Sequence, residues 1–343
     1  MDRRNVIIDK KTPEFVGNKN ALSKARKDIE SICNEMGFIS IAIVSKSYSL
    51  KLIAYTYNIW QYLKAILKLP FNSNVYIQFP APFSRTSYYK WLILSARMKG
   101  CKVYLIIHDV ESLRYNSKEK QAEVAMLNMA DAIIVHTEAM KLALAQMGVN
   151  VSMIILSIFD YCTNAIMPKE LISGNTIAFA GNLEKSPFLQ KLINEESDVL
   201  YRLYGKTPPF DLGTNTTLEY CGSFSPEQVD TIKASWGLVW DGSSLDTCTG
   251  LTGEYLRYNS PHKLSLYIAA GIPVIVWEDS AVAEFVIKHN IGICVKDILS
   301  IGKQLNSISK ERYEQIALSV QAMATRLRSG SMIKESINRI RTM

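Results

Sequence analysis

Six consecutive residues, Tyr258-Asn259-Ser260-Pro261-His262-Lys263, have the composition of a helix start that can hold an anion. Ser260 is a good N-cap, Pro261 fits the first helical position and Gly271 fits the left-handed position after the end, so the spacing predicts a short helix. Its first turn offers backbone N–H groups and the positive end of the dipole, beside the charge of Lys263. The pattern favours a diphosphate site, with a plain amphipathic helix as the alternative.

A second signal in the same half is Gly181-Asn182, which follows the apolar run Thr176–Ala180 and precedes Lys185. A flexible polar turn at the C-terminal end of a strand lets backbone N–H groups approach a phosphate. A lone Gly-Asn pair is most often an ordinary turn, so this signal has weight only together with Lys263.

Two acidic residues follow predicted strands of this half and could bind a ribose or a sugar through its hydroxyls. Asp241 comes directly after Gly237–Trp240, and Glu284 follows Pro273–Trp277. Asp241 is the better placed, at a strand end, whereas an ordinary helix-surface acid is an equally good interpretation of Glu284.

In the first half, the apolar run Val103–Ile107 is typical of a buried parallel strand and ends in His108-Asp109. We expect both side chains at the rim of a cleft, where a carboxylate or imidazole can take a proton from an attacking hydroxyl. Asp109 is the first candidate base, with His108 and Glu111 behind it. The alternative is that Asp109 caps the following turn.

Two series of strands alternating with helices surround these residues. Crossover segments such as Ala21–Met36 and Ser87–Met98 are long enough for helices, so each series predicts a doubly wound parallel sheet. Ligands of such sheets bind at strand C-terminal ends. The predicted strands of the first series are Asn5–Asp9, Ser40–Val44, Val75–Phe79, Val103–His108 and Ala132–His136; those of the second are Thr176–Ala180, Leu200–Tyr204, Leu218–Cys221, Gly237–Trp240, Pro273–Trp277 and Gly292–Val295.

The stretch Phe159–Asn175 reads as a linker between the two series. Near the chain end, a helix is predicted after Ser309 and a shorter one after Gly330. The expected buried face of the first is formed by Tyr313, Ile316, Ala317, Val320, Met323 and Leu327.

The composition is that of a folded protein, with 343 residues, 48% hydrophobic and 21% charged, and the length favours two domains and hence a cleft. The net charge of +7 is uneven, because residues 1–150 hold 21 Lys/Arg against 12 Asp/Glu. Such a basic half suits anionic lipid, nucleic acid or a phosphorylated substrate, or is simply a solvated face. No nucleic-acid recognition motif is present, so we expect no nucleic-acid partner.

The cysteine pattern and the absence of binding motifs bear on the cellular compartment and on cofactors. The six cysteines are scattered without a Cys-x-x-Cys pair, which indicates reduced thiols in a cytoplasmic protein. Neither a dinucleotide-binding glycine motif nor a P-loop is present, and no cluster has metal-ligand spacing, so we expect no metal and no resident cofactor.

The stretch Lys51–Lys68 combines helical spacing of apolar residues with three lysines, three tyrosines and no acid. It could lie in a membrane interface, against the alternative of an ordinary packed helix with an outer lysine face.

Several segments together resemble bacterial β-1,6-galactofuranosyltransferases of O-antigen synthesis and, more distantly, the streptococcal glucosyltransferases that extend N-acetylglucosamine on serine-rich adhesins. The resemblance covers most of the chain and is densest between residues 236 and 296. Its motifs are Lys24-Ala25-Arg26-Lys27-Asp28, Ile107-His108-Asp109 with Leu113-Arg114, Ala180-Gly181-Asn182-Leu183, Gly237-Leu238-Val239-Trp240-Asp241-Gly242, Thr247-Cys248 and Asn259-Ser260-Pro261-His262-Lys263.

The resemblance implies a GT-B fold of two Rossmann-like domains, with UDP-sugar bound by the second. By that resemblance Lys185 and Lys263 would contact the diphosphate, with Tyr258 and Asn259 close by, and Glu284 would bind the ribose. His262 is included in the candidate donor site. Lys185 stands where the adhesin enzymes have arginine, which keeps the charge but loses a bidentate fork.

The implied domains are residues 1–158 for the acceptor, a linker at 159–175, residues 176–320 for the nucleotide sugar, and a helix at 321–343 that packs back on the first domain. The implied reaction is inverting transfer of galactofuranose or another hexose from UDP to a saccharide hydroxyl, on an oligosaccharide or lipid-linked acceptor. The expected protein is a cytoplasmic homo-oligomer, in contact with the inner membrane face through residues 51–68. Alternatives are a glucosyltransferase acting on a GlcNAc-modified protein and a non-catalytic GT-B partner of another transferase.

Overall fold

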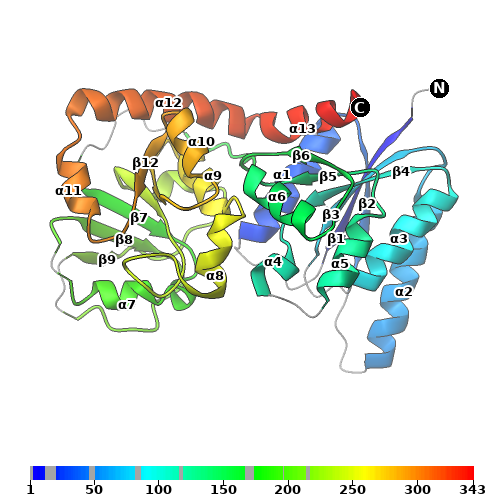
Figure 1. Ribbon diagram of the computed structural model, residues 1–343, viewed down its shortest axis with the longest axis horizontal. Coiled ribbons are helices and arrows are strands. Elements are labelled where there is room, and N and C mark those ends of the chain that lie inside the picture. The colour runs from blue at the N-terminus through cyan, green and yellow to red at the C-terminus, as the bar shows by residue number, and fades with distance from the viewer. Residues whose placement is uncertain are drawn as a thin grey trace. The chain divides into compact units, whose positions relative to one another are not determined.

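A computed structural model describes residues 3–11, 21–45, 51–81, 86–115, 119–166, 174–195, 197–213 and 217–343. The chain separates into two compact units, unit 1 formed by Met1–Leu156 with Ile333–Met343, and unit 2 formed by Ser157–Met332. Each unit is an α/β layer structure around its own parallel sheet (Figure 1).

The sheet of unit 1 has the strand order β2-β1-β3-β4-β5-β6, and all its pairings are parallel. The order reverses between β1 and β3, which makes the carboxyl ends of these two strands the switch point of the sheet. The strands are β1 Asn5–Lys11, β2 Ile39–Val44, β3 Asn74–Phe79, β4 Lys102–Ile107, β5 Ala132–Val135 and β6 Ser152–Ile155; the helices are α1 Ala21–Glu35, α2 Lys51–Lys68, α3 Thr86–Met98, α4 Glu111–Tyr115, α5 Lys120–Leu127 and α6 Glu138–Gln146.

The sheet of unit 2 has the order β12-β11-β10-β7-β8-β9, again with parallel pairings, and its switch point lies between β7 and β10. Its strands are β7 Thr176–Ala180, β8 Leu200–Tyr204, β9 Leu218–Tyr220, β10 Trp236–Val239, β11 Val274–Trp277 and β12 Gly292–Val295. Its helices are η2 Leu183–Lys185, α7 Phe188–Leu192, η3 Val229–Thr231, α8 Gly250–Glu254, η4 Tyr255–Arg257, α9 His262–Ala269, α10 Ala283–Lys288, α11 Ile301–Asn306 and α12 Lys310–Arg328, followed by α13 Ser331–Arg341.

Both sheets could be predicted from the sequence because their central strands are buried. β4 is buried from Val103 to Ile107, and β10 and β11 are buried along their whole length. Strands covered on both faces read as continuous apolar runs, and every strand predicted from such a run is present. The edge strand β6 was not predicted, because it has only four residues and none of them is fully buried.

The end of the chain forms two helices, α12 and α13. All six residues predicted for the buried face of α12 are buried. The Tyr313 hydroxyl donates to the Ser235 carbonyl at 2.9 Å, and Arg328 donates to the carbonyls of Ala165 and Ala269, which fixes α12 within unit 2. The helix expected at 321–343 therefore differs from the structure, since only residues from Ile333 onward group with unit 1.

The linker expected at 159–175 lies partly outside the described residues, at 167–173. The division between the units falls before it, between Leu156 and Ser157. In the part of the chain that the structure describes, no helix is both long enough and apolar enough to cross a membrane.

His136 follows β5 and is 2% exposed. Its Nε2 hydrogen bonds to the carbonyl oxygen of Ile107 at 3.0 Å, at the end of the neighbouring strand β4. Burial lowers the pKa of this imidazole to about 4, partly opposed by the bond to Ile107. The ring is therefore neutral in the folded protein at neutral pH, with Nε2–H as the donor.

Acid should destabilise the protein through His136. Since its pKa in the folded protein is about 4, against 6.5 for an ordinary histidine, the unfolded chain binds the extra proton between these values. The free energy of unfolding should fall from pH 6.5 towards pH 4, by at most roughly 1 kcal/mol per pH unit from this group. His136→Gln should flatten this limb in urea unfolding, whereas His289→Gln, at a half-buried position, should change it less. An unchanged slope in His136→Gln would contradict the assignment.

Candidate functional site

The ammonium of Lys263 lies across the carboxyl ends of β7 and β10. Its Nζ donates to Asp241 Oδ1 at 2.7 Å and to the Trp240 carbonyl at 3.2 Å. It also lies 4.6 Å from the centroid of the Phe179 ring in β7. The Lys263 side chain is 17% exposed, so its charge is partly shielded yet accessible from solvent.

Gly181, directly after β7, allows this approach. A Cβ added at Gly181 would lie 3.1 Å from Lys263 Cε, so a larger residue would displace the lysine stem. Three positions singled out in the sequence, Gly181, Asp241 and Lys263, are thus brought together at the switch point of unit 2. Strand ends adjacent at a switch point are the usual ligand position in such sheets.

The helix that carries Lys263 is held against the same two strands by Tyr267. The Tyr267 hydroxyl accepts a hydrogen bond from the Ala180 N–H at 2.7 Å, and its ring lies against Gly237, where any side chain would collide with it. Gly271 has φ +77°, as predicted for the left-handed position after α9. Two strands therefore fix the position and direction of α9.

The start of α9 differs by one residue from the prediction. Pro261, with ψ 140°, is the N-cap, and no side chain caps the helix in its place. Ser260, the expected cap, is 3% exposed and lies in the interior. The helix thus begins at His262, and Lys263 lies in its first turn.

Three backbone N–H groups in and after the turn that follows β7 already have protein partners. The Gly181 N–H donates to the Tyr204 carbonyl at 2.9 Å and so continues the sheet. The Asn182 side chain accepts from the N–H groups of Glu184 and Lys185 and thereby caps η2. A backbone contact to phosphate from this turn would therefore have to come from its other N–H groups, those of Asn182 and Leu183.

Asp241 holds Lys263, a partnership that the sequence analysis missed. With a side chain 24% exposed, the carboxylate anchors the ammonium between the strand ends. An ammonium has three N–H donors, and among the residues that the structure describes the oxygen partners of Lys263 are Asp241 and Trp240. The spacing of 22 residues gave no local signal for this ion pair.

Three further donor-site candidates, Tyr258, Asn259 and His262, lie just before Lys263 in the sequence, at the start of α9. The backbone N–H groups of Tyr258 and Asn259 both donate to the Tyr255 carbonyl. Asn259 Oδ1 is buried and has no hydrogen-bond partner among the residues that are described, so it is a candidate acceptor for a ligand. The His262 ring packs between aromatic neighbours, 5.9 Å from Phe159 and 5.2 Å from Tyr161.

The two other donor-site candidates are exposed. Lys185 ends η2, four residues after Gly181, and Glu284 lies in the first turn of α10. The loop leading to α10 is tied to the segment before α9, because Ala281 N–H donates to the Leu256 carbonyl at 2.8 Å. Both residues follow strands of the same parallel sheet, so they lie on its carboxyl-end side.

In unit 1, the candidate bases have different environments. The side chain of Asp109 is 27% exposed and lies 3.4 Å from Arg114 Nη1, whereas His108 is only 5% exposed. The expectation that both side chains face outward is therefore wrong for His108. Glu111 begins α4, and burial together with the nearby carboxylates of Glu123 and Glu119 raises its pKa.

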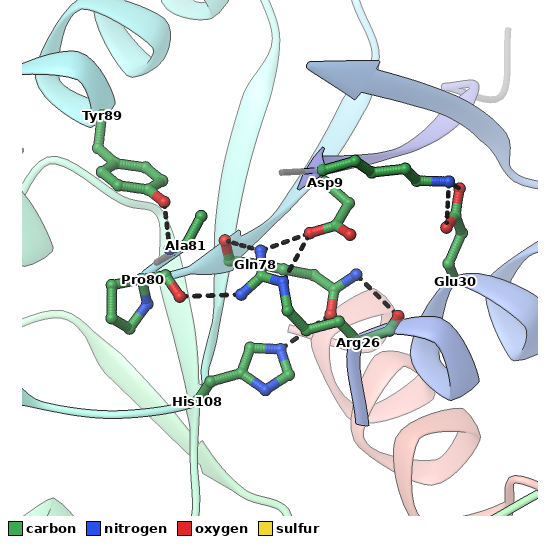
Figure 2. A network of polar contacts seen from close by, with 9 residues as sticks. Asp9, Arg26, Glu30, Gln78, Pro80, Ala81, Tyr89 and His108 are labelled. Carbon is green, nitrogen blue, oxygen red and sulfur yellow. Dashed lines mark hydrogen bonds and ion pairs between the residues drawn. The ribbon is translucent and has the colours of Figure 1, made fainter. Parts of the chain in front are cut away.

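A buried guanidinium fills the switch point of unit 1 (Figure 2). Arg26, on α1 and 4% exposed, donates to Asp9 Oδ1 through Nε at 2.9 Å and also through Nη2. Its other bonds reach the carbonyls of Gln78 at 3.1 Å and Pro80 at 2.8 Å. Burial raises the pKa of Asp9, and the charge of Arg26 opposes this rise.

The same network fixes His108. Gln78 Nε2 donates to the Arg26 carbonyl at 3.1 Å, so Gln78 Oε1 accepts from His108 Nε2 at 2.8 Å (Figure 2). This orientation places a proton on Nε2. His108 is therefore a member of a structural network that ties the ends of β3 and β4, directly before Asp109.

No group of three or more His, Cys, Asp or Glu side chains that could hold a metal occurs among the residues that the structure describes.

Comparison with known proteins identifies the family. The model of the glucosyltransferase 3-like N-terminal domain matches residues 14–158, and that of the C-terminal domain matches residues 177–340. The chain belongs to the glucosyltransferase 3-like family. It is therefore a glycosyltransferase, and the family boundary agrees with the gap between the two predicted strand series.

Two curated relatives are similar over most of their length. The β-1,6-galactofuranosyltransferase WbbI of Escherichia coli K12 is 28% identical over 73% of this chain and 75% of its own. Glucosyltransferase 3 of Streptococcus gordonii is 26% identical over 71% of this chain and 72% of its own. Both relatives were expected from the motifs of the sequence.

Among solved structures, sucrose-phosphate synthase of Thermosynechococcus elongatus matches with a TM-score of 0.63 at 11% identity, over 99% of this chain and 100% of its own. This likeness shows the fold, which is GT-B, as predicted.

Loss of Arg26 should destabilise this glycosyltransferase strongly. Arg26→Met leaves the Asp9 carboxylate buried without its partner, which typically costs about 3–5 kcal/mol of the free energy of unfolding. Lys27→Met, at the next and exposed position of α1, should cost less than about 0.5 kcal/mol. Chemical denaturation of both variants measures the difference. Equal stability would show that the network does not hold unit 1 together.

Proposed function

We propose that this glycosyltransferase moves a hexosyl group from a UDP-sugar to a hydroxyl of a saccharide acceptor, with inversion. The observation that carries the proposal is the Lys263 ammonium at the switch point of unit 2, in the first turn of α9 and against Gly181. A diphosphate there would accept a hydrogen bond from the ammonium and meet the positive end of the helix dipole.

The donor contacts follow from the residues around Lys263. Lys185 adds a second positive charge on the same side of the sheet, and the Asn259 amide oxygen would accept a bond from a hydroxyl of the donor. Glu284 would bind the ribose hydroxyls, as the family resemblance implies. Asp241 acts through Lys263, because it holds the ammonium in place.

The proposed reaction is a direct displacement. The acceptor hydroxyl oxygen attacks the anomeric carbon, the bond from that carbon to the diphosphate oxygen breaks, and UDP leaves with the electron pair. Lys263 and Lys185 stabilise the charge that develops on the leaving group, without need of a metal ion. The hydroxyl proton passes to a carboxylate of unit 1, with Asp109 as first candidate.

Similarity to WbbI favours galactofuranose as the sugar and cell-surface polysaccharide synthesis as the role, on a lipid-linked acceptor at the cytoplasmic face of the membrane. The second candidate is glucosyl transfer to a GlcNAc-modified protein, supported by the family models and by the similarity to glucosyltransferase 3. The two candidates share the nucleotide and differ in the sugar and the acceptor.

Turnover of a donor panel tests the proposal. With UDP-galactofuranose, UDP-galactose and UDP-glucose offered beside saccharide acceptors, we expect UDP release and a glycosylated product by mass spectrometry, unchanged by a chelator. Lys263→Gln should weaken UDP binding about 10- to 100-fold, since bonds to charged groups are worth roughly 1.5–3 kcal/mol. Lys288→Gln, at an exposed position of α10, is the matched control. Absence of UDP release with every donor, or unaltered binding in Lys263→Gln, would refute the proposal.

The base can be assigned by comparing two carboxylates. Asp109→Asn should lower kcat about 10²- to 10⁴-fold, as expected for loss of a general base, with UDP affinity unchanged. Arg114→Gln breaks the same ion pair but keeps the carboxylate, so it should lower kcat far less. If Glu111→Gln rather than Asp109→Asn shows the large loss, the base is Glu111. If neither does, unit 1 supplies no carboxylate base from this segment.

A further inference from the structure

The outer faces of α2 and α3, with the turn between α2 and β3, expose large apolar side chains. Trp60 is 54% exposed, Leu67 80%, Phe71 71%, Trp91 68% and Met98 81%. They recur at helical spacing on each helix, opposite the residues that α2 and α3 bury. We call this surface the α2–α3 face.

Direct contacts make the α2–α3 face one surface. The Tyr62 and Tyr88 rings stack with centroids 5.1 Å apart, and α2 and α3 lie side by side (Figure 1). Lys99, directly after Met98, donates to the carbonyls of Ile66 and Leu69 at the end of α2. The same ammonium lies 5.0 Å from the Phe71 ring centroid. These contacts bring the C-terminal ends of both helices and the turn together.

The segment that contains α2 and α3 carries positively charged residues and no acidic ones. From Met36 to His108 the sequence holds nine Lys/Arg and no Asp or Glu. Lys64 and Lys68 are exposed beside the apolar stripe of α2, and Lys64 lies over the Trp60 ring at 5.0 Å. Arg97 is paired with Asp131 at 3.9 Å, so it contributes less to the net charge.

The exposed apolar side chains and the lysines together indicate what binds to the α2–α3 face. In a two-fold dimer the same patch faces itself, so the lysines of two copies would oppose each other. An anionic lipid surface instead accepts apolar side chains below its headgroups and attracts lysines at their level, and tryptophan is enriched at that depth. Snorkelling allows Lys64 and Lys68 to remain at the headgroups beside Trp60 and Leu67.

We propose that the α2–α3 face docks the protein on an anionic membrane surface. The inference goes beyond the proposed reaction, because it needs neither the donor nor the base. It widens the contact expected from residues 51–68 to include the turn at Phe71 and the outer face of α3. Of that stretch, the structure gives no side-chain description for Lys51 and Leu52.

Vesicle flotation tests the proposal. The full chain should float with vesicles of phosphatidylcholine containing roughly one third phosphatidylglycerol, far less with phosphatidylcholine alone, and less as salt is raised. The double variant Leu67→Glu with Met98→Glu should reduce the bound fraction by about tenfold or more. Lys64→Glu with Lys68→Glu should remove the preference for anionic vesicles.

Leu318→Glu, at a 64% exposed position on α12, is the matched control and should float like the wild type. UDP release with a soluble acceptor should be unchanged in the double variant, and Lys263→Gln should float normally, so failure of docking and failure of the reaction are distinguishable. Wild-type protein that stays unbound, or a double variant that floats fully, overturns the proposal. So does light scattering that shows a wild-type dimer converted to monomer by the double variant with vesicle binding unaltered, because the face is then a contact between copies.

Discussion

The proposed donor site of this glycosyltransferase depends on one ammonium group placed across two strand ends. Lys263 reaches the carboxyl ends of β7 and β10 because α9 is fixed by Tyr267, which bonds to one strand and packs on a glycine of the other. Asp241 then holds the charge at 2.7 Å. The surrounding protein screens this partly buried charge less than water would, while the Asp241 carboxylate offsets part of it.

The two units use the same sheet architecture in opposite ways. In unit 1 the switch point is filled by the buried Arg26, whose guanidinium is satisfied by Asp9 and two backbone carbonyls. In unit 2 the corresponding point carries Lys263, which remains 17% exposed and has a proton donor to offer. The Arg26 guanidinium is buried among protein partners and stabilises the sheet, whereas the Lys263 ammonium remains accessible from solvent. This difference in exposure, rather than the fold, supports the proposal that the nucleotide binds to unit 2.

The sequence predicted most of the strands, both sheets and the short helix that carries Lys263 because these leave local signals. Buried parallel strands read as apolar runs, and the Pro261 to Gly271 segment marks a short helix. The partnerships could not be predicted, since Asp241 and Lys263 are 22 residues apart and Gln78 and His108 are 30 apart. The same limit applies to the turn after β7, because only the pairing with β8 shows that the Gly181 N–H is already bonded to Tyr204.

Arg26 also shows how the resemblance motifs divide between structure and chemistry. The segment around Arg26 and the pair His108-Asp109 lie far apart in sequence, yet Gln78 joins them through two side-chain hydrogen bonds. His108 is then a residue that positions the loop after β4, and Asp109 is the first side chain beyond the network that reaches solvent. A motif can thus contain one residue that maintains the backbone and a neighbour that is available for chemistry. Burial and hydrogen bonding, which the sequence does not display, distinguish the two.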